Sequence, residues 1–204
     1  MFKSLKKLFK KKGSQDKSLE QGILNEQISK SLNDFKNRPI YKVLSGEIID
    51  KTPNDELLQV IFDNLCEKFP KDYTKEYSTL LTFSKSLQTI YVIWWLEAEV
   101  NNGGFNQYYA NSSGQYATMV PDALMLIGAK KFAELVSKAN FIYETENERI
   151  TRYQDGTVEG FSKSYKENPL SDCDDVFFEL YKTEKLYNLQ IEFIRKNKLD
   201  FIDK

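Results

Sequence analysis

Histidine does not occur in this sequence of 204 residues, and cysteine occurs only at Cys66 and Cys173. The lack of histidine excludes Ser-His-Asp and Cys-His catalysis, HExxH zinc sites and the commonest general base of enzymes. Two cysteines without histidine cannot supply the ligands of a usual structural zinc site. Because no secretory signal is recognisable, we interpret both cysteines as reduced thiols of a cytosolic protein, with Cys66 in the core. The composition favours a non-enzymatic protein without a metal or a cofactor.

Long apolar runs are also lacking. The longest, Ile90 to Leu96, is far shorter than the roughly 18–20 residues that a membrane span needs. Acidic residues are absent from residues 1–12, which hold six lysines. The remainder holds 23 basic and 30 acidic residues, a net charge of −7. The first part favours anionic partners, whereas the acidic remainder is not expected to bind nucleic acid directly.

Residues 1–13, MFKSLKKLFKKKG, have the pattern of a short basic amphipathic helix. Phe2, Leu5 and Phe9 fall on one side of a helical wheel. The candidate contacts to a membrane or another anion lie opposite them and are Lys3, Lys6, Lys7, Lys10 and Lys11. Two interpretations stay open: a solvated tail that aids solubility, or an arm that lies on the anionic inner surface of a membrane or contacts nucleic acid.

The remaining pattern is helical, with no strand alternation and no internal repeat. The first expected helix runs from just after Ser18 to Asn37, and the others cover 55–69, 74–101, 105–110, 117–139 and 172–198. Residues 40–54 are the one clear non-helical segment. Residues 144–169 are polar and are broken by glycine and proline. Gly128 interrupts the fifth helix, which is therefore either bent or split into two at a corner. The expected fold class is all-α: a single compact multi-helix bundle around a central apolar helix, with a basic N-terminal arm. We divide the chain into the arm at 1–13, an N-terminal helical extension at 14–69 and a helical domain at 70–198.

The central helix contains a carboxylate in an unusual place. On a helical wheel Glu97 falls inside the apolar arc, between Ile90 and Ile93, whereas Glu99 points outward. Asn101 lies closer still to the apolar line. Glu97 is therefore predicted to be at least partly buried, so it must be hydrogen-bonded or paired, or its pKa must rise.

The segment NNGGFNQYYANSSG, residues 101–114, follows Glu97 and offers backbone N–H groups, amides, hydroxyls and phenols as its partners. One interpretation is structural: Glu97 and Asn101 tie the glycine turn to the core. The other is functional: a polar pocket that binds a ligand or another chain, or hydrolyses a substrate. The candidate pocket comprises Glu97, Asn101, Asn102, Gly103, Gly104, Phe105, Gln107, Tyr108, Asn111 and Ser112.

The last predicted helix carries a second carboxylate, Glu184, within an apolar stripe. Glu97 and Glu184 could both face inward and hold a divalent metal or share a proton, or Glu184 could neutralise a basic residue; the sequence leaves these alternatives open. Ser171 is the expected N-cap of this helix. Three aspartates surround Cys173 and should raise the pKa of its thiol, which argues against a nucleophile.

Two motifs resemble a known bacterial family. The residues that carry the resemblance are Asn102, Gly103, Gly104, Phe105, Gln107, Tyr108, Tyr109, Asn111, Ser112 and Gly114, followed by Ala123, Leu124, Ile127, Gly128 and Ala129. They are similar to the domain named after the C-terminal part of a DNA mimic protein, over roughly residues 70–195. The resemblance implies an all-α domain, often dimeric, whose founding member imitates the charge of DNA and binds a transcriptional repressor. B-DNA carries one charge per about 1.7 Å, so a net charge of −7 is low for such a mimic.

Three functions follow as predictions. The leading one is a non-enzymatic protein-interaction module, resembling a DNA mimic protein, that binds a regulatory partner such as a transcriptional regulator; the resemblance also allows a homodimer, and the sequence leaves the oligomeric state open. The first alternative is a ligand-binding or hydrolytic pocket around Glu97 and residues 101–114. The second is a peripheral membrane protein tethered through residues 1–12. The expected location is the cytoplasm, or the inner membrane surface if the arm acts as a tether.

Overall fold

The computed structural model describes residues 24–166 and 168–203, and the chain divides into two compact units, 1–40 and 41–204. In the first unit, residues 24–36 are helical. The helix ends before Pro39, as expected, and the Arg38 guanidinium lies 3.7 Å from the centre of the Phe35 ring. The predicted arm, residues 1–13 with Lys3, Lys6, Lys7, Lys10 and Lys11, lies outside the described residues. Residues 41–69 belong to the same compact unit as the rest of the chain after them.

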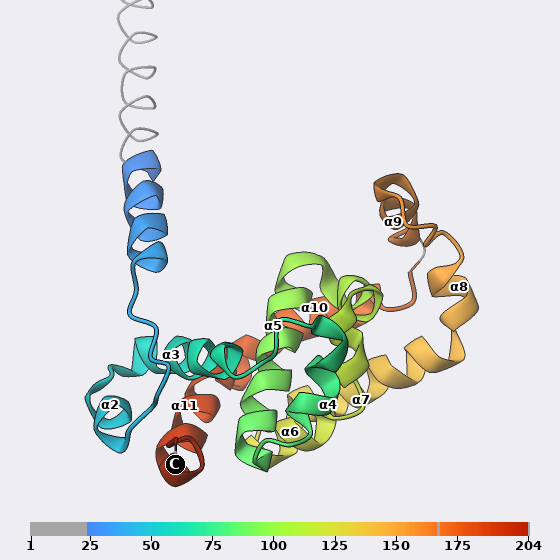
Figure 1. Ribbon diagram of the computed structural model, residues 1–204. Coiled ribbons are helices and arrows are strands. Elements are labelled where there is room, and N and C mark those ends of the chain that lie inside the picture. Colours follow the sequence, from blue (N-terminus) through green and yellow to red (C-terminus); the bar gives the residue numbers. More distant parts are fainter. Residues whose placement is uncertain (1–23, 167, 204) are drawn as a thin grey trace, which may run out of the picture. The chain divides into compact units, whose positions relative to one another are not determined.

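The second unit is built from helices and turns (Figure 1). Its α-helices are α2 (Gly46–Lys51), α3 (Asn54–Glu67), α4 (Glu76–Leu80), α5 (Lys85–Ala110), α6 (Val120–Ile127), α7 (Lys130–Thr145), α8 (Asn147–Thr151), α9 (Val158–Ser164), α10 (Ser171–Thr183) and α11 (Leu186–Lys196). Short 3-10 helices are η1 (Tyr73–Lys75), η2 (Ser112–Tyr116) and η3 (Lys198–Asp200). The described part of the chain contains no strand, so the predicted all-α class is confirmed.

Helix α5 lies at the centre of the second unit and contacts α3, α6, η2 and α10 (Figure 1). Its first half buries Ile90, Ile93, Leu96 and Val100 almost completely. Because neighbours cover several sides of α5, burial extends around most of the helix rather than along one stripe. The predicted central apolar helix is therefore confirmed. Because neighbouring helices cover several of its sides, some polar side chains of α5 are also buried.

The predicted helix over 74–101 is wrong at its start. The chain forms η1 and α4 first, and α5 begins only after Ser84, whose hydroxyl accepts a hydrogen bond from the Leu87 N–H at 3.3 Å. At the other end the prediction is confirmed: Gly103 and Gly104 have non-helical backbone angles, so the helical stretch before them ends in a bend and a second stretch of α5 continues to Ala110. The bend is possible because two consecutive glycines tolerate backbone angles that other residues avoid.

Gly128 resolves the open choice in the fifth predicted helix. Its φ of 88° is left-handed, so α6 and α7 are two helices that meet at a corner. Glu184 caps the N-terminus of α7, because its carboxylate accepts from the Lys131 N–H at 3.3 Å and the Phe132 N–H at 3.1 Å. Glu184 itself is extended and separates α10 from α11. The single helix predicted over 172–198 is therefore wrong. The backbone is extended at Glu184, so α10 ends there, and the Glu184 carboxylate caps α7.

Several smaller predictions are also wrong. Residues 40–54, predicted to be non-helical, contain α2, which Ser45 caps. The polar segment 144–169, for which the sequence predicted no particular structure, contains α8 and α9, with Thr157 as the N-cap of α9. Ser171 is the first residue of α10 and makes no capping bond. Cys66 is exposed, because α3 turns it away from the core. Among the described residues, no helix combines the length and apolar character that crossing a membrane requires.

Candidate functional site

The bend of α5 is the first feature of the candidate site. Gly104 has φ 70° and ψ −176°, a combination that is essentially confined to glycine. The next N–H, of Phe105, donates to Oδ1 of Asp174 on α10 at 2.7 Å. The carbonyl of Gly103 accepts from the Tyr165 hydroxyl at 2.8 Å. The bend thus ties the second half of α5 to α10 and to the residue after α9.

Glu97 lies six residues before Gly103 and is half-buried, as predicted. Its Oε1 accepts from the Tyr181 hydroxyl at 2.7 Å, and its Oε2 accepts from Nε2 of Gln190 at 2.7 Å. Asn101 is exposed rather than turned inward, and its Nδ2 donates to the backbone oxygen of Glu97 at 2.7 Å. Burial raises the pKa of Glu97, and the bonds from Tyr181 and Gln190 oppose that rise.

Glu99 contradicts its predicted outward position. Only 9% of its surface is exposed, and its Oε2 accepts from both Gln107 at 2.6 Å and Asn111 at 2.8 Å. The wheel fails because it treats α5 as straight and covered on one side. In the structure the bend brings Gln107 and Asn111 next to Glu99. The amides of Gln107, in α5, and Asn111, just after it, both donate to the Glu99 carboxylate.

Asn106 anchors α9 to the second half of α5. It is 1% exposed, its Nδ2 donates to the Ser164 hydroxyl at 2.8 Å, and its Oδ1 accepts from Nδ2 of Asn168 at 2.9 Å. Asn168 continues the network by accepting from the Leu170 N–H at 2.9 Å. The candidate list did not contain Asn106, although its place in the NNGGFN motif was a signal that could have included it.

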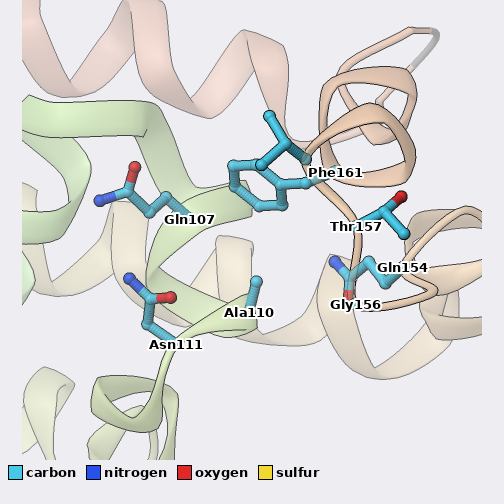
Figure 2. A pocket seen from close by; sticks show the side chains of 8 residues that line it. Gln107, Ala110, Asn111, Gln154, Gly156, Thr157 and Phe161 are labelled. Atoms are coloured by element: carbon cyan, nitrogen blue, oxygen red, sulfur yellow. The ribbon is translucent and has the colours of Figure 1, made fainter.

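A cavity of about 610 Å³ separates the second half of α5 from the segment that leads into α9. In Figure 2, Gln107 and Asn111 stand on one side, Gln154 and Thr157 on the other, and Phe161 lies between them. The volume is within the range of about 300–1,000 Å³ that is typical of ligand pockets. None of the described residues that line it is charged, and Nε2 of Gln154 is buried without a hydrogen-bond partner among the described residues. Such a lining suits a neutral polar molecule with an acceptor group rather than an ion.

The structure distributes the candidate residues over several environments. Gln107 and Asn111 line the cavity, whereas Glu97 does not, and Asn101 joins Glu97 in a separate network. Asn102 and Ser112 are exposed. Phe105 and Tyr108 are in the core, where the Tyr108 hydroxyl has no hydrogen-bond partner. The sequence did not single out the lining residues Gln154, Thr157 and Phe161. They lie in a polar segment whose apolar residues show little helical periodicity.

The two inward carboxylates, Glu97 and Glu184, bind different groups: Glu97 accepts from side chains, and Glu184 from the N-terminus of α7. Within the described residues no group of three or more acidic or cysteine side chains is placed to hold a metal ion. Cys173 is buried, and burial together with the neighbouring Asp174 and Asp172 raises the pKa of its thiol, against an opposing effect of Lys138. The direction agrees with the sequence prediction, but burial is the larger cause.

Replacing Glu97 with glutamine is expected to remove one pH dependence of stability. Because the folded pKa lies above the ordinary value of 4.5, protonated Glu97 stabilises the fold fully below about pH 4.5, and this contribution is lost as the pH rises through the folded pKa. Glu97→Gln should therefore be at least as stable as the wild type at neutral pH. Its new amide can also donate to the buried, unpartnered Oε1 of Gln190 once that side chain turns over. Urea unfolding at several pH values, with a carboxyl-carbon NMR titration of Glu97, measures both effects.

Glu134→Gln on the exposed face of α7 is the matched control, because it removes the same charge from a solvated site. We expect that variant to keep the pH dependence of the wild type. A folded pKa of Glu97 at or below 4.5, or a clear loss of stability in Glu97→Gln at neutral pH, would contradict the expected result.

Acidic residues gather in one part of the second unit. Residues 144–184, here called the acidic segment, contain eleven Asp or Glu and five Lys or Arg, a formal net charge of −6. The segment contains α8, α9 and α10 and includes the Gln154 to Phe161 side of the cavity. Its charge thus lies next to the glycine bend, which Asp174 of the same segment holds in place.

Comparison with known proteins places this arrangement in a family. The sequence model of a family described as DMP19-like protein matches residues 81–197. The matched region runs from just before α5 to the end of α11 and therefore includes the glycine bend, the cavity and the acidic segment. A search of curated proteins finds no match to the chain. Because the family match covers more than half of the 204 residues, this chain belongs to the DMP19-like protein family.

Proposed function

We propose that the chain is a non-enzymatic protein-interaction module that binds a DNA-binding regulatory protein through the acidic segment. The observation that carries the proposal is the concentration of net charge −6 in residues 144–184, inside the matched region of a DNA mimic family. A surface that binds DNA is basic, and an acidic surface of comparable charge spacing can occupy it in place of DNA.

Helix α10 supplies the most regular part of this surface. Asp172, Asp175 and Glu179 are exposed and lie three and four residues apart, which puts them on one face of the helix. Along the helix axis they are about 4.5 and 6 Å apart at 1.5 Å per residue. One DNA strand carries a phosphate about every 3.4 Å, so the stripe approaches the charge spacing of a single strand.

Ion pairs within the acidic segment are local and exposed. Glu159 pairs with Lys163 at 2.7 Å and Glu179 with Lys182 at 2.6 Å, each within one helical turn. Exposed pairs of this kind contribute about 0–1 kcal/mol, so a cationic partner can replace the lysine at little cost. The carboxylates of Glu159 and Glu179 therefore stay available to a basic surface.

The test uses the immobilised full chain and a lysate of the cells that encode it. We expect it to retain a DNA-binding protein that added duplex DNA releases. The triple variant Asp172→Asn, Asp175→Asn, Glu179→Gln should retain roughly tenfold less of that protein, because three favourable charge contacts are lost. Asp174 is left unchanged, since its carboxylate holds the bend of α5.

A matched triple variant, Asp55→Asn, Glu56→Gln, Glu192→Gln, removes the same charge from exposed positions of α3 and α11. It should bind like the wild type. If both variants lose the same amount of bound protein, net charge alone determines binding and the α10 stripe has no specific role. If duplex DNA does not release the bound protein, the surface does not act as a DNA mimic.

A further inference from the structure

A second cavity lies where the end of α3, α4 and the first half of α5 meet, away from the residues described above. Its volume is about 430 Å³, and its lining includes Phe69, Tyr73, Tyr91, Trp95 and Glu76. Aromatic faces combined with a carboxylate form the kind of site that binds organic cations, because the negative face of each ring attracts positive charge. We propose that this cavity binds a small quaternary ammonium group.

The rings are held as walls of the cavity. The ring centres of Phe69 and Tyr91 are 4.8 Å apart with planes 34° apart, and those of Tyr91 and Trp95 are 6.3 Å apart with planes 73° apart. Tyr91 is almost completely buried, so its position is fixed by the core. Because the rings of Phe69, Tyr91 and Trp95 are packed against one another, a cation that contacts them meets a preformed surface, which lowers the entropic cost of binding.

Glu76 places a negative charge beside these rings. Its Oε1 accepts from the hydroxyls of Tyr91 and Tyr116, each at 2.6 Å. No residue in the described part of the chain donates to its Oε2, so one oxygen of a positioned carboxylate is left for a ligand. A second carboxylate of the lining, Glu67, lies 3.7 Å from the exposed Lys42. Lys71 is the cation of the described lining and Lys42 offsets Glu67 from outside it, so the negative charge that a ligand meets at the rings is that of Glu76.

The test follows tryptophan fluorescence of the full chain during titration with choline. The chain has two tryptophans, and one of them, Trp95, lines the cavity. The control ligand is 3,3-dimethylbutan-1-ol, which has the shape of choline without its charge. We expect saturable binding of choline and at least tenfold weaker binding of the alcohol. Equal binding of the two, or no saturable change with choline, would overturn the proposal.

Variants give the direction of the charge effect. Glu76→Gln should weaken choline binding about tenfold, and Lys71→Gln should strengthen it, because the two changes shift the charge of the lining in opposite directions. Tyr73 is 84% exposed, so Tyr73→Leu should fold normally and weaken binding about threefold, whereas Tyr73→Phe keeps the ring and the affinity. If neither Glu76→Gln nor Lys71→Gln changes the affinity, the cavity does not recognise charge. Sedimentation with phosphatidylcholine vesicles distinguishes a lipid headgroup from free choline as the source of the cation.

Discussion

Replacing Gly104 with alanine is expected to lower the free energy of unfolding by about 3–5 kcal/mol, because the change combines backbone strain with a steric clash. The φ of 70° with ψ near 180° is accessible to glycine and costly for alanine. A Cβ at this position would lie 2.4 Å from Oδ2 of Asp174, whose Oδ1 accepts from the Phe105 N–H. Neither group can move freely, since moving Asp174 removes that hydrogen bond. Urea unfolding measures the loss.

Gly128→Ala is the control for a positive φ without a steric clash. Gly128 also has a positive φ, of 88°, but no atom lies within 4 Å of a Cβ built there. We expect it to cost about 1–2 kcal/mol. The double variant Gly104→Ala, Asp174→Ala should recover at least about 1 kcal/mol relative to the sum of the single changes, because the clash is relieved. Equal costs at the two glycines, with no coupling to Asp174, would contradict a role of the carboxylate in holding the bend.

Replacing Asn106 with leucine is expected to detach α9 from α5 at a cost of about 2–3 kcal/mol. Leucine has a similar size but cannot pair with the Ser164 hydroxyl or with Nδ2 of Asn168, both of which are buried. Buried polar groups that lose a partner cost about 1–3 kcal/mol each. Since α9 is a short helix, we expect local opening of residues 154–170 before global unfolding.

Hydrogen exchange measured by mass spectrometry separates the local effect from the global one. Protection should fall in 154–170 and remain in the first half of α5, whose buried apolar side chains do not depend on Asn106. Asn102→Leu changes an exposed amide of the same motif and should leave the exchange pattern as it is in the wild type. Uniform loss of protection along the chain would show that Asn106 stabilises the whole core rather than one wall of the cavity.

Helix α10 combines two roles on opposite faces. Asp174 faces inward to the bend of α5, and burial raises the pKa of its carboxyl despite the hydrogen bond from Phe105. Asp172, Asp175 and Glu179 face solvent. An acidic run that looks uniform in the sequence is thus divided by helical geometry into one structural carboxylate and a charged outer stripe. The variants of the proposed interaction therefore leave Asp174 intact.

The sequence by itself determined the helical class, the interruptions at Gly103-Gly104 and Gly128, and the burial of Glu97. Each of these follows from local chemistry or from the period of a single helix: glycine permits a left-handed φ, and apolar spacing marks a covered face. The NNGGF motif likewise indicated the family by resemblance to a known pattern, and the structure places this motif at the bend where Asp174 of α10 holds α5.

Only the tertiary structure decided the partners. Glu99 is buried because the bend of α5 and the helices around it cover a side that the wheel left in solvent, and Glu184 ends its own helix because it caps α7. Gln154 reaches the cavity from a segment more than forty positions after Gln107. A helical wheel assumes a straight helix with one covered face, so it cannot predict which distant element covers a second face. Contacts between residues far apart in the chain depend on how the helices pack, and that packing determined which polar side chains form networks and which line a cavity.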